Sequence, residues 1–205
     1  MAETEREGVS KFDLRFTPAA PIRPAALHGL IGWRDILFRL GLIGQDPQRY
    51  GGLAYGNVSL SLGAGEFLIS ATQTGGLTTL TEHHFAHVQR CQPSLNRVWA
   101  SGPLPPSSEA MTHGVIYANR PEAGCVLHVH SPSIWRSAEY QGIPVTDAAV
   151  AYGTPAMAQT VRGLIDTERM IHKGLFAMGG HEDGVVSFAG DVETAACALL
   201  RALVD

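Results

Sequence analysis

The chain has 205 residues, of which 45% are apolar, so a single domain can bury a sizeable hydrophobic core. Its formal net charge of -4, without a dense run of Lys or Arg, argues against nucleic acid or an acidic membrane as a partner. Three cysteines are too few for a disulfide framework, and neither a secretion signal nor a membrane-length apolar run is visible. We therefore expect a soluble protein of the reducing cytoplasm.

The first part of the chain predicts a leader, a helix and a hairpin. Residues 1–24 are charged and then contain several prolines, which is typical of a loosely ordered leader ahead of a single domain over residues 25–205. Apolar residues recur at near-helical spacing over residues 25–42, which predicts the first helix. Alternating residues over 51–62 and 66–70 predict a β-hairpin.

The rest of the chain alternates between expected helices and strands. A capping residue predicts a short helical stretch over 81–88, and Ser107 or Ser108 is expected to cap a helix over 109–119. Further helices are expected over 134–140, over 154–165 and after Asp191, and strands over 122–132, 175–178 and 185–188. This interleaving indicates a mixed three-layer α/β domain.

Two histidines lie in the expected strand over 122–132. Successive strand side chains point to opposite faces, so His128 and His130 project the same way and can bind one metal ion. The same alternation directs Cys125 and Val129 into a core on the other face. The alternative interpretation is a pair of hydrogen-bonded core histidines, because burying an unpaired imidazole costs free energy.

Two further residues are candidates for the same site. His181 lies among glycines ahead of the last expected strand, where the backbone can turn sharply and direct a side chain into a site. Glu109 begins a helix after two prolines and two serines, so its carboxylate can reach beyond the helix N-terminus. An ordinary turn residue and an ordinary capping residue are the alternatives, and the residues alone leave both open.

Six short motifs occur in an order that resembles a known family. They are Gly56-Asn-Val-Ser59, Leu68-Ile-Ser70 with Thr74-Gly75, Pro106-Ser-Ser-Glu109, Arg120-Pro-Glu122 through His128-Val-His-Ser-Pro132, Tyr152-Gly-Thr154, and Gly180-His181. Together they resemble the class II aldolase/adducin family, which includes L-fuculose-phosphate aldolase and L-ribulose-phosphate 4-epimerase. The resemblance implies an α/β/α sandwich with a central, largely antiparallel mixed sheet, and a homotetramer with active sites at its subunit interfaces.

The resemblance also implies roles for individual residues. It makes His128, His130 and His181 ligands of Zn²⁺, with Mn²⁺, Fe²⁺ or Co²⁺ as alternatives. It makes Glu109 both the residue that completes the metal site and the catalytic acid/base. The positions that hold a substrate phosphate in the family, here also ordinary turn and cap residues, match Asn57, Thr74, Gly75, Ser107 and Ser108.

The function implied by the resemblance is a metal-dependent aldehyde-lyase of carbohydrate metabolism, acting on a small sugar or sugar phosphate through a metal-stabilised enediolate. One departure leaves the reaction open: the fuculose-type aldolase has a catalytic Tyr shortly after the Ile-Pro that matches Ile143-Pro144, and this chain has none there. Asp147 in that region is similar to an Asp of the epimerase subgroup and is a second catalytic candidate. A 4-epimerase, a dehydratase and a non-catalytic adducin-like interaction module are the alternatives.

Overall fold

The computed structural model describes residues 10–150, 154–165, 167, 170 and 173–204. The first nine residues of the expected leader, and Tyr152 and Gly153 of one family motif, lie outside this part. None of the helices in the described ranges has both the length and the apolar character needed to cross a membrane.

Eight strands of the described chain form one sheet in the order β1-β7-β6-β5-β4-β8-β10-β9. Every neighbouring pair is antiparallel except β1 and β7, which are parallel. A small second sheet pairs β2 with β3. The strands are Asp13–Pro18 (β1), Gly44–Gln45 (β2), Ala54–Tyr55 (β3), Asn57–Gly63 (β4), Glu66–Ser70 (β5), Phe85–Gln92 (β6), Arg97–Gly102 (β7), Cys125–His130 (β8), Leu175–Ala177 (β9) and Gly184–Ala189 (β10).

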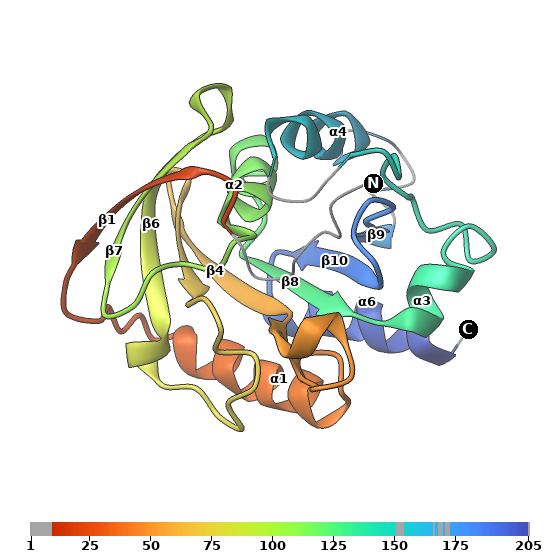
Figure 1. Ribbon diagram of the computed structural model, residues 1–205, viewed down its shortest axis with the longest axis horizontal. Coiled ribbons are helices and arrows are strands. Elements are labelled where there is room, and N and C mark those ends of the chain that lie inside the picture. The colour runs from red at the N-terminus through yellow and green to blue at the C-terminus, as the bar shows by residue number, and fades with distance from the viewer. Residues whose placement is uncertain (1–9, 151–153, 166, 168–169, 171–172, 205) are drawn as a thin grey trace.

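Helices cover both faces of the large sheet and make three layers (Figure 1). On one face lie α1 (Leu27–Arg39), α3 (Pro132–Ser137) and α6 (Val192–Val204), and on the other lie α2 (Ala110–Asn119) and α4 (Pro155–Ile165). A separate hydrophobic core fills the space between the sheet and each helical layer. The expected three-layer sandwich with a largely antiparallel mixed sheet is confirmed.

Strand β8 has the alternation that the sequence predicts. Cys125 and Val129 are fully buried in the core beneath α1 and α6. Val126 lies in the core on the opposite face, beneath α2 and α4. His128 and His130 share the parity of Val126 and therefore project toward the α2 side.

Two expectations about local structure are wrong. The leader over residues 1–24 contains strand β1, which pairs in parallel with β7 over its whole length. The stretch over 81–88 is helical only at Glu82–His84, a single 3₁₀ turn, and then becomes β6. Phe85 and Val88 of β6 are buried in the hydrophobic core. The pairing of β6 with the distant strands β5 and β7 therefore outweighs the local capping signal.

Candidate metal centre

Three buried histidines come from two neighbouring elements of the sheet. His128 and His130 end strand β8 and are 0% and 1% exposed. His181, 3% exposed, lies in the turn between β9 and β10. Because β10 runs antiparallel to β8 and places Gly184 opposite His130, this turn brings His181 back over the end of β8.

The three imidazoles face one another. One ligand nitrogen from each ring lies within 4.8 Å of the others, and the ring centroids are 5.0, 5.3 and 4.8 Å apart. Nitrogen donors about 2.1 Å from a shared tetrahedral ion are about 3.4 Å apart, so small ring rotations would bring this triad to coordination distance. The geometry fits a single transition-metal ion.

The electrostatics of the triad favour neutral, ligand-competent rings. Burial lowers the pKa of His128 to about 4 and lowers the pKa of both His130 and His181 well below the usual range. Neither ring nitrogen of His128 makes a well-formed hydrogen bond within the described residues, although the nearby backbone of Val185 opposes part of the pKa shift. The convergence of His128 with the two other buried rings therefore favours the metal interpretation over an ordinary core histidine.

Glu109 lies at the N-terminus of α2, where it is the N-cap residue and is 1% exposed. Its amide donates to Oγ of Ser107 at 3.3 Å, and no serine side chain caps the helix in the manner expected of Ser107 or Ser108. The group of described residues whose ligand atoms converge consists of the three histidines and does not include Glu109. Its role as a fourth ligand stays a prediction.

A further buried histidine, His113, lies on α2 one turn after Glu109. His113 is fully buried, and its Nδ1 lies 2.7 Å from Oγ of Ser59 on β4. Burial, and to a lesser extent the proximity of His128, hold the pKa of His113 well below its usual range. His113 is therefore a neutral neighbour of the triad, on the same helix face as Glu109.

The five residues matched to a phosphate site line one small pocket. Asn57, Thr74, Gly75, Ser107 and Ser108 all contribute to its wall. Asn57 is the register partner of His128 across strands β4 and β8, so the pocket adjoins the triad. The structure thus brings together segments that are far apart in the sequence.

Asp147 does not join this group. It is exposed, and its Oδ1 accepts a hydrogen bond of 2.9 Å from the amide of Ala149, which makes a local turn. Among the residues that the structure describes, no contact joins its carboxylate to the triad, so the catalytic role considered for Asp147 gains no support.

Four residues beside the triad were not singled out from the sequence. The ring of Tyr50 lies 4.5 Å from the ring of His130, and that of Tyr55 lies 5.4 Å from it. Tyr50 donates to Oδ2 of Asp183 at 2.7 Å and accepts from Nη2 of Arg49 at 2.5 Å. The signal available in the sequence was the pair of tyrosines flanking a Gly-Gly dipeptide directly before the family motif of β4.

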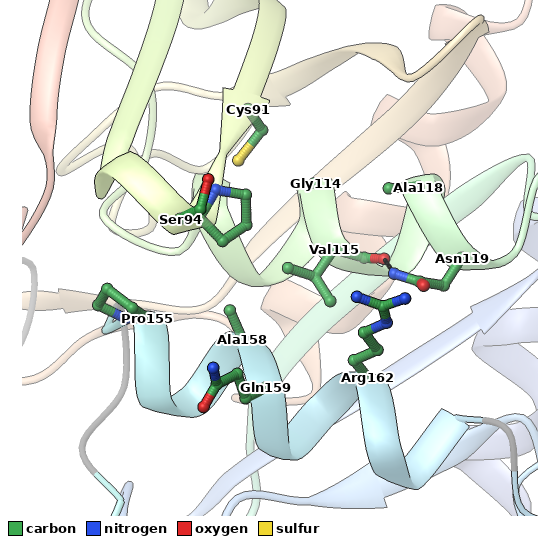
Figure 2. Close-up of a pocket in the computed structure, with 11 residues that line it drawn as sticks. Cys91, Ser94, Gly114, Val115, Ala118, Asn119, Pro155, Ala158, Gln159 and Arg162 are labelled. Carbon is green, nitrogen blue, oxygen red and sulfur yellow. Dashed lines mark hydrogen bonds between the residues drawn. The ribbon is translucent and has the colours of Figure 1, made fainter.

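A larger cavity lies away from this chemistry. It has a volume of about 640 Å³ and is formed between the C-terminal half of α2, helix α4 and the turn that follows β6 (Figure 2). Arg162 of α4 points toward Asn119 of α2 across it. None of the site residues predicted from the sequence belongs to its wall.

Residues 47–200 match the sequence profile described as Class II Aldolase and Adducin N-terminal domain. Comparison with curated proteins gave no match.

Several solved structures are similar to this chain. The crystal structure of YgbL from Escherichia coli, a candidate aldolase, epimerase or decarboxylase, has 19% sequence identity over 85% of this chain and 83% of its own, with a TM-score of 0.62. An L-fuculose-1-phosphate aldolase from Thermus thermophilus has 19% identity, coverages of 87% and 86%, and a TM-score of 0.54. A sugar-phosphate aldolase from Thermotoga maritima has 18% identity, coverages of 87% and 95%, and a TM-score of 0.54. These structural similarities establish the fold, and because the profile covers most of the chain, this protein belongs to the class II aldolase/adducin family.

Proposed function

We propose that this enzyme is a metal-dependent aldehyde-lyase that acts on a small sugar or sugar phosphate. The observation that carries the proposal is the convergence of three buried histidines on one point at the end of β8. A non-catalytic, adducin-like interaction module has no need of such a group.

His128, His130 and His181 would hold the ion, for which Zn²⁺ is the first choice and Mn²⁺, Fe²⁺ or Co²⁺ are alternatives. When bound, the ion supplies a Lewis acid that stabilises negative charge on the oxygens of a hydroxy-carbonyl substrate. Burial keeps the three rings neutral, so their lone pairs are available near neutral pH without loss of a proton.

Glu109 is the residue we assign to proton transfer at the carbon beside the substrate carbonyl. Its carboxyl group is buried at the N-terminus of α2, where the helix dipole interacts favourably with negative charge. His113, one turn further along α2, is close enough to His128 for its pKa to be affected, which supports an orientation of this helix end toward the triad. The pocket of Asn57, Thr74, Gly75, Ser107 and Ser108 would hold the substrate's phosphate with uncharged groups.

A 4-epimerase and a dehydratase would use the same histidines and the same carboxylate. They differ in the bond that breaks. The residues directly after Pro144 are Val145-Thr-Asp-Ala148, so the Tyr that the fuculose-type aldolase has shortly after its matching Ile-Pro is absent at this place. Product analysis with sugar phosphates separates the three reactions: aldehyde release identifies a lyase, an inverted carbinol an epimerase, and loss of water a dehydratase.

The proposal is tested first by metal analysis of the purified protein and of two variants. We expect about one equivalent of transition metal in the wild-type protein, its loss in His130→Ala, and its retention in His28→Ala, which replaces an exposed histidine of α1. Full metal occupancy in His130→Ala would overturn the site. Bound metal without turnover of any sugar or sugar phosphate would overturn the lyase assignment.

We further propose a cytoplasmic homotetramer with active sites at the subunit interfaces. The location is supported by Cys91, Cys125 and Cys197, all of which are free thiols. The assembly is supported by the family resemblance, and light scattering of the purified chain measures it directly.

A further inference from the structure

A buried arginine supports the loop that carries part of the phosphate pocket. Arg34 lies in α1 and is 1% exposed. Its Nη2 donates to the carbonyl oxygen of Thr74 at 3.1 Å and to that of Gly75 at 2.7 Å. Its Nη1 lies 3.3 Å from Oδ1 of Asp35, the neighbouring residue of the same helix. One nitrogen of this guanidinium, Nη2, thus donates to two consecutive main-chain carbonyls.

These two bonds help to fix where the next amides point, together with the amide of Leu77, which also donates to the carbonyl of Thr74 at 3.1 Å. In a trans peptide the carbonyl and the following N–H point in opposite directions. Because the carbonyls of Thr74 and Gly75 are directed at Arg34, the N–H groups of Gly75 and Gly76 are directed away from it. Within the described residues neither amide donates a hydrogen bond to a protein acceptor.

The same loop is held from its other side as well. Oε1 of Gln73 accepts from the amide of Ala54 at 3.2 Å, and Oγ1 of Thr74 donates to the carbonyl of Ala71 at 2.7 Å. A Cβ on Gly75 would lie 2.7 Å from the carbonyl oxygen of Tyr55, so the chain passes here with no room for a side chain. The orientation of the loop is therefore built into the fold.

Arg34 does not belong to the wall of the pocket that Thr74 and Gly75 help to form. The residues of that wall are all uncharged, so the guanidinium behind the loop is the positive group associated with it. Asn57, also in the wall, is 7% exposed and its Oδ1 has no partner within the described chain. A ligand with both acceptor oxygens and hydroxyl groups would satisfy the amides and this oxygen together.

We propose that Arg34 is a positioning residue, which orients the Thr74–Gly76 segment so that its amides bind the phosphate monoester group of the substrate. This inference rests on the proposed function and narrows its substrate class to phosphorylated compounds. Arg34 acts through the loop and does not touch the substrate. Lys in its place would keep the charge, but its single nitrogen could not contact both Asp35 and the two carbonyls, as the two terminal nitrogens of Arg34 do.

The test measures binding of inorganic phosphate and of glycerol 3-phosphate to the metal-loaded protein by calorimetry. The variants are Arg34→Gln and Arg34→Lys, and the matched control is Arg39→Gln, which removes an exposed arginine from the same helix. We expect Arg34→Gln to weaken the binding of both probes at least tenfold, Arg34→Lys to weaken it less, and Arg39→Gln to leave it unchanged. The metal content should stay the same in all of them, which a general loss of structure would not allow.

Equal phosphate affinity in the wild-type protein and both Arg34 variants would overturn the inference. So would the absence of any phosphate binding by a wild-type protein that retains its metal, and that result leaves the metal centre intact. Absence of metal from the wild-type protein speaks instead against the proposed function.

If the Arg34 variants do not fold, the wild-type protein labelled with ¹⁵N-glycine decides the question. We expect the amide resonances of Gly75 and Gly76 to shift when phosphate is added and that of Gly32, which lies on exposed α1, to stay in place. Unchanged resonances of both loop glycines would overturn the inference.

Discussion

The hydroxyl of Tyr50 donates a hydrogen bond of 2.7 Å to Oδ2 of Asp183, although 133 positions separate the two residues in the chain. This bond joins the segment before β3 to the turn that carries His181. Tyr50 and Asp183 both have positive φ, at 51° and 61°, a conformation that costs energy in residues other than glycine. Burial and the hydrogen bond to Asp183 raise the pKa of Tyr50, so the phenol stays protonated and remains a donor. The contact therefore holds two strained segments together beside the three buried histidines.

Tyr50→Phe should destabilise the protein because it removes the donor to a buried carboxylate. Among the described residues, the Asp183 carboxylate would then keep only Arg49 as a side-chain partner, with Nη2 of Arg49 3.7 Å from Oδ2 of Asp183. We expect the free energy of unfolding to fall by about 1–3 kcal/mol in denaturant titrations. Tyr140→Phe is the control, because Tyr140 is 91% exposed and should tolerate the change. Equal losses in the two variants would contradict a structural role for the bond.

The metal-free protein should lose stability when the pH is lowered from about 6.5 to about 4. Burial lowers the pKa of His128 to about 4, against 6.5 for an ordinary histidine. Between about pH 6.5 and pH 4 the imidazole of His128 is protonated in the unfolded chain and neutral in the folded chain. The free energy of unfolding therefore decreases as the pH is lowered through this range. The stabilisation is fully present above pH 6.5. His128 alone accounts for about 3 kcal/mol over this range.

This pH dependence is measured by denaturant titration of the metal-free protein between pH 7.5 and about 4. The variant His128→Gln removes one titrating group and should give a shallower decline. His28→Gln, which changes an exposed histidine, should reproduce the wild-type slope. A slope unchanged in His128→Gln would show that the ring is already accessible to protons in the folded state.

Two glycines in helices should respond to alanine in opposite ways. A Cβ on Gly114 of α2 would lie 2.6 Å from Cβ and 2.7 Å from Sγ of Cys91, so Gly114→Ala should cost about 1–3 kcal/mol through overpacking. Gly32 of α1 has no atom within 4 Å of the added Cβ. Gly32→Ala should stabilise the protein by about 0.5–1 kcal/mol, because alanine loses less backbone entropy in a helix. Thermal unfolding of the two variants checks both signs, and a stabilised Gly114→Ala would show that β6 can move away from α2.

The parts of the fold that could be predicted from the sequence are those set by local patterns. Strand β8 follows from period-two alternation, and the cap of α6 follows from Asp191, whose Oδ1 accepts from the amide of Thr194 at 2.8 Å. Strands β1 and β6 were missed because their stability comes from pairing with distant segments. At Thr81 the local capping signal is real, but it supports only one turn of helix before β6 begins.

The residues of the candidate site also divide into those that a local sequence pattern indicates and those whose contacts depend on the folded chain. His128 and His130 are indicated by the strand period alone, whereas His181 and Glu109 needed the order of the family motifs. Tyr50 and Asp183 could not be found, because their contact depends on two turns with positive φ that bring distant segments together. The same holds for Arg34, whose partners are main-chain carbonyls and leave no mark in the sequence.

Gly75→Ala should weaken the binding of phosphate without changing the metal content of the protein. The added Cβ would lie 2.7 Å from the carbonyl oxygen of Tyr55 and 2.8 Å from that of Gly44. Both contacts are with main-chain atoms, so the loop must shift rather than a side chain rotate, at a cost of about 1–3 kcal/mol. We expect phosphate binding to weaken at least tenfold in calorimetry, because the loop amides lose their orientation. The metal content should not change, since β8 and the turn carrying His181 do not contain the substitution.

The matched control is Gly163→Ala on the open surface of α4, which should retain both the phosphate binding and the metal content of the wild-type protein. Loss of metal together with phosphate binding in Gly75→Ala would show that the two sites are one cooperative unit.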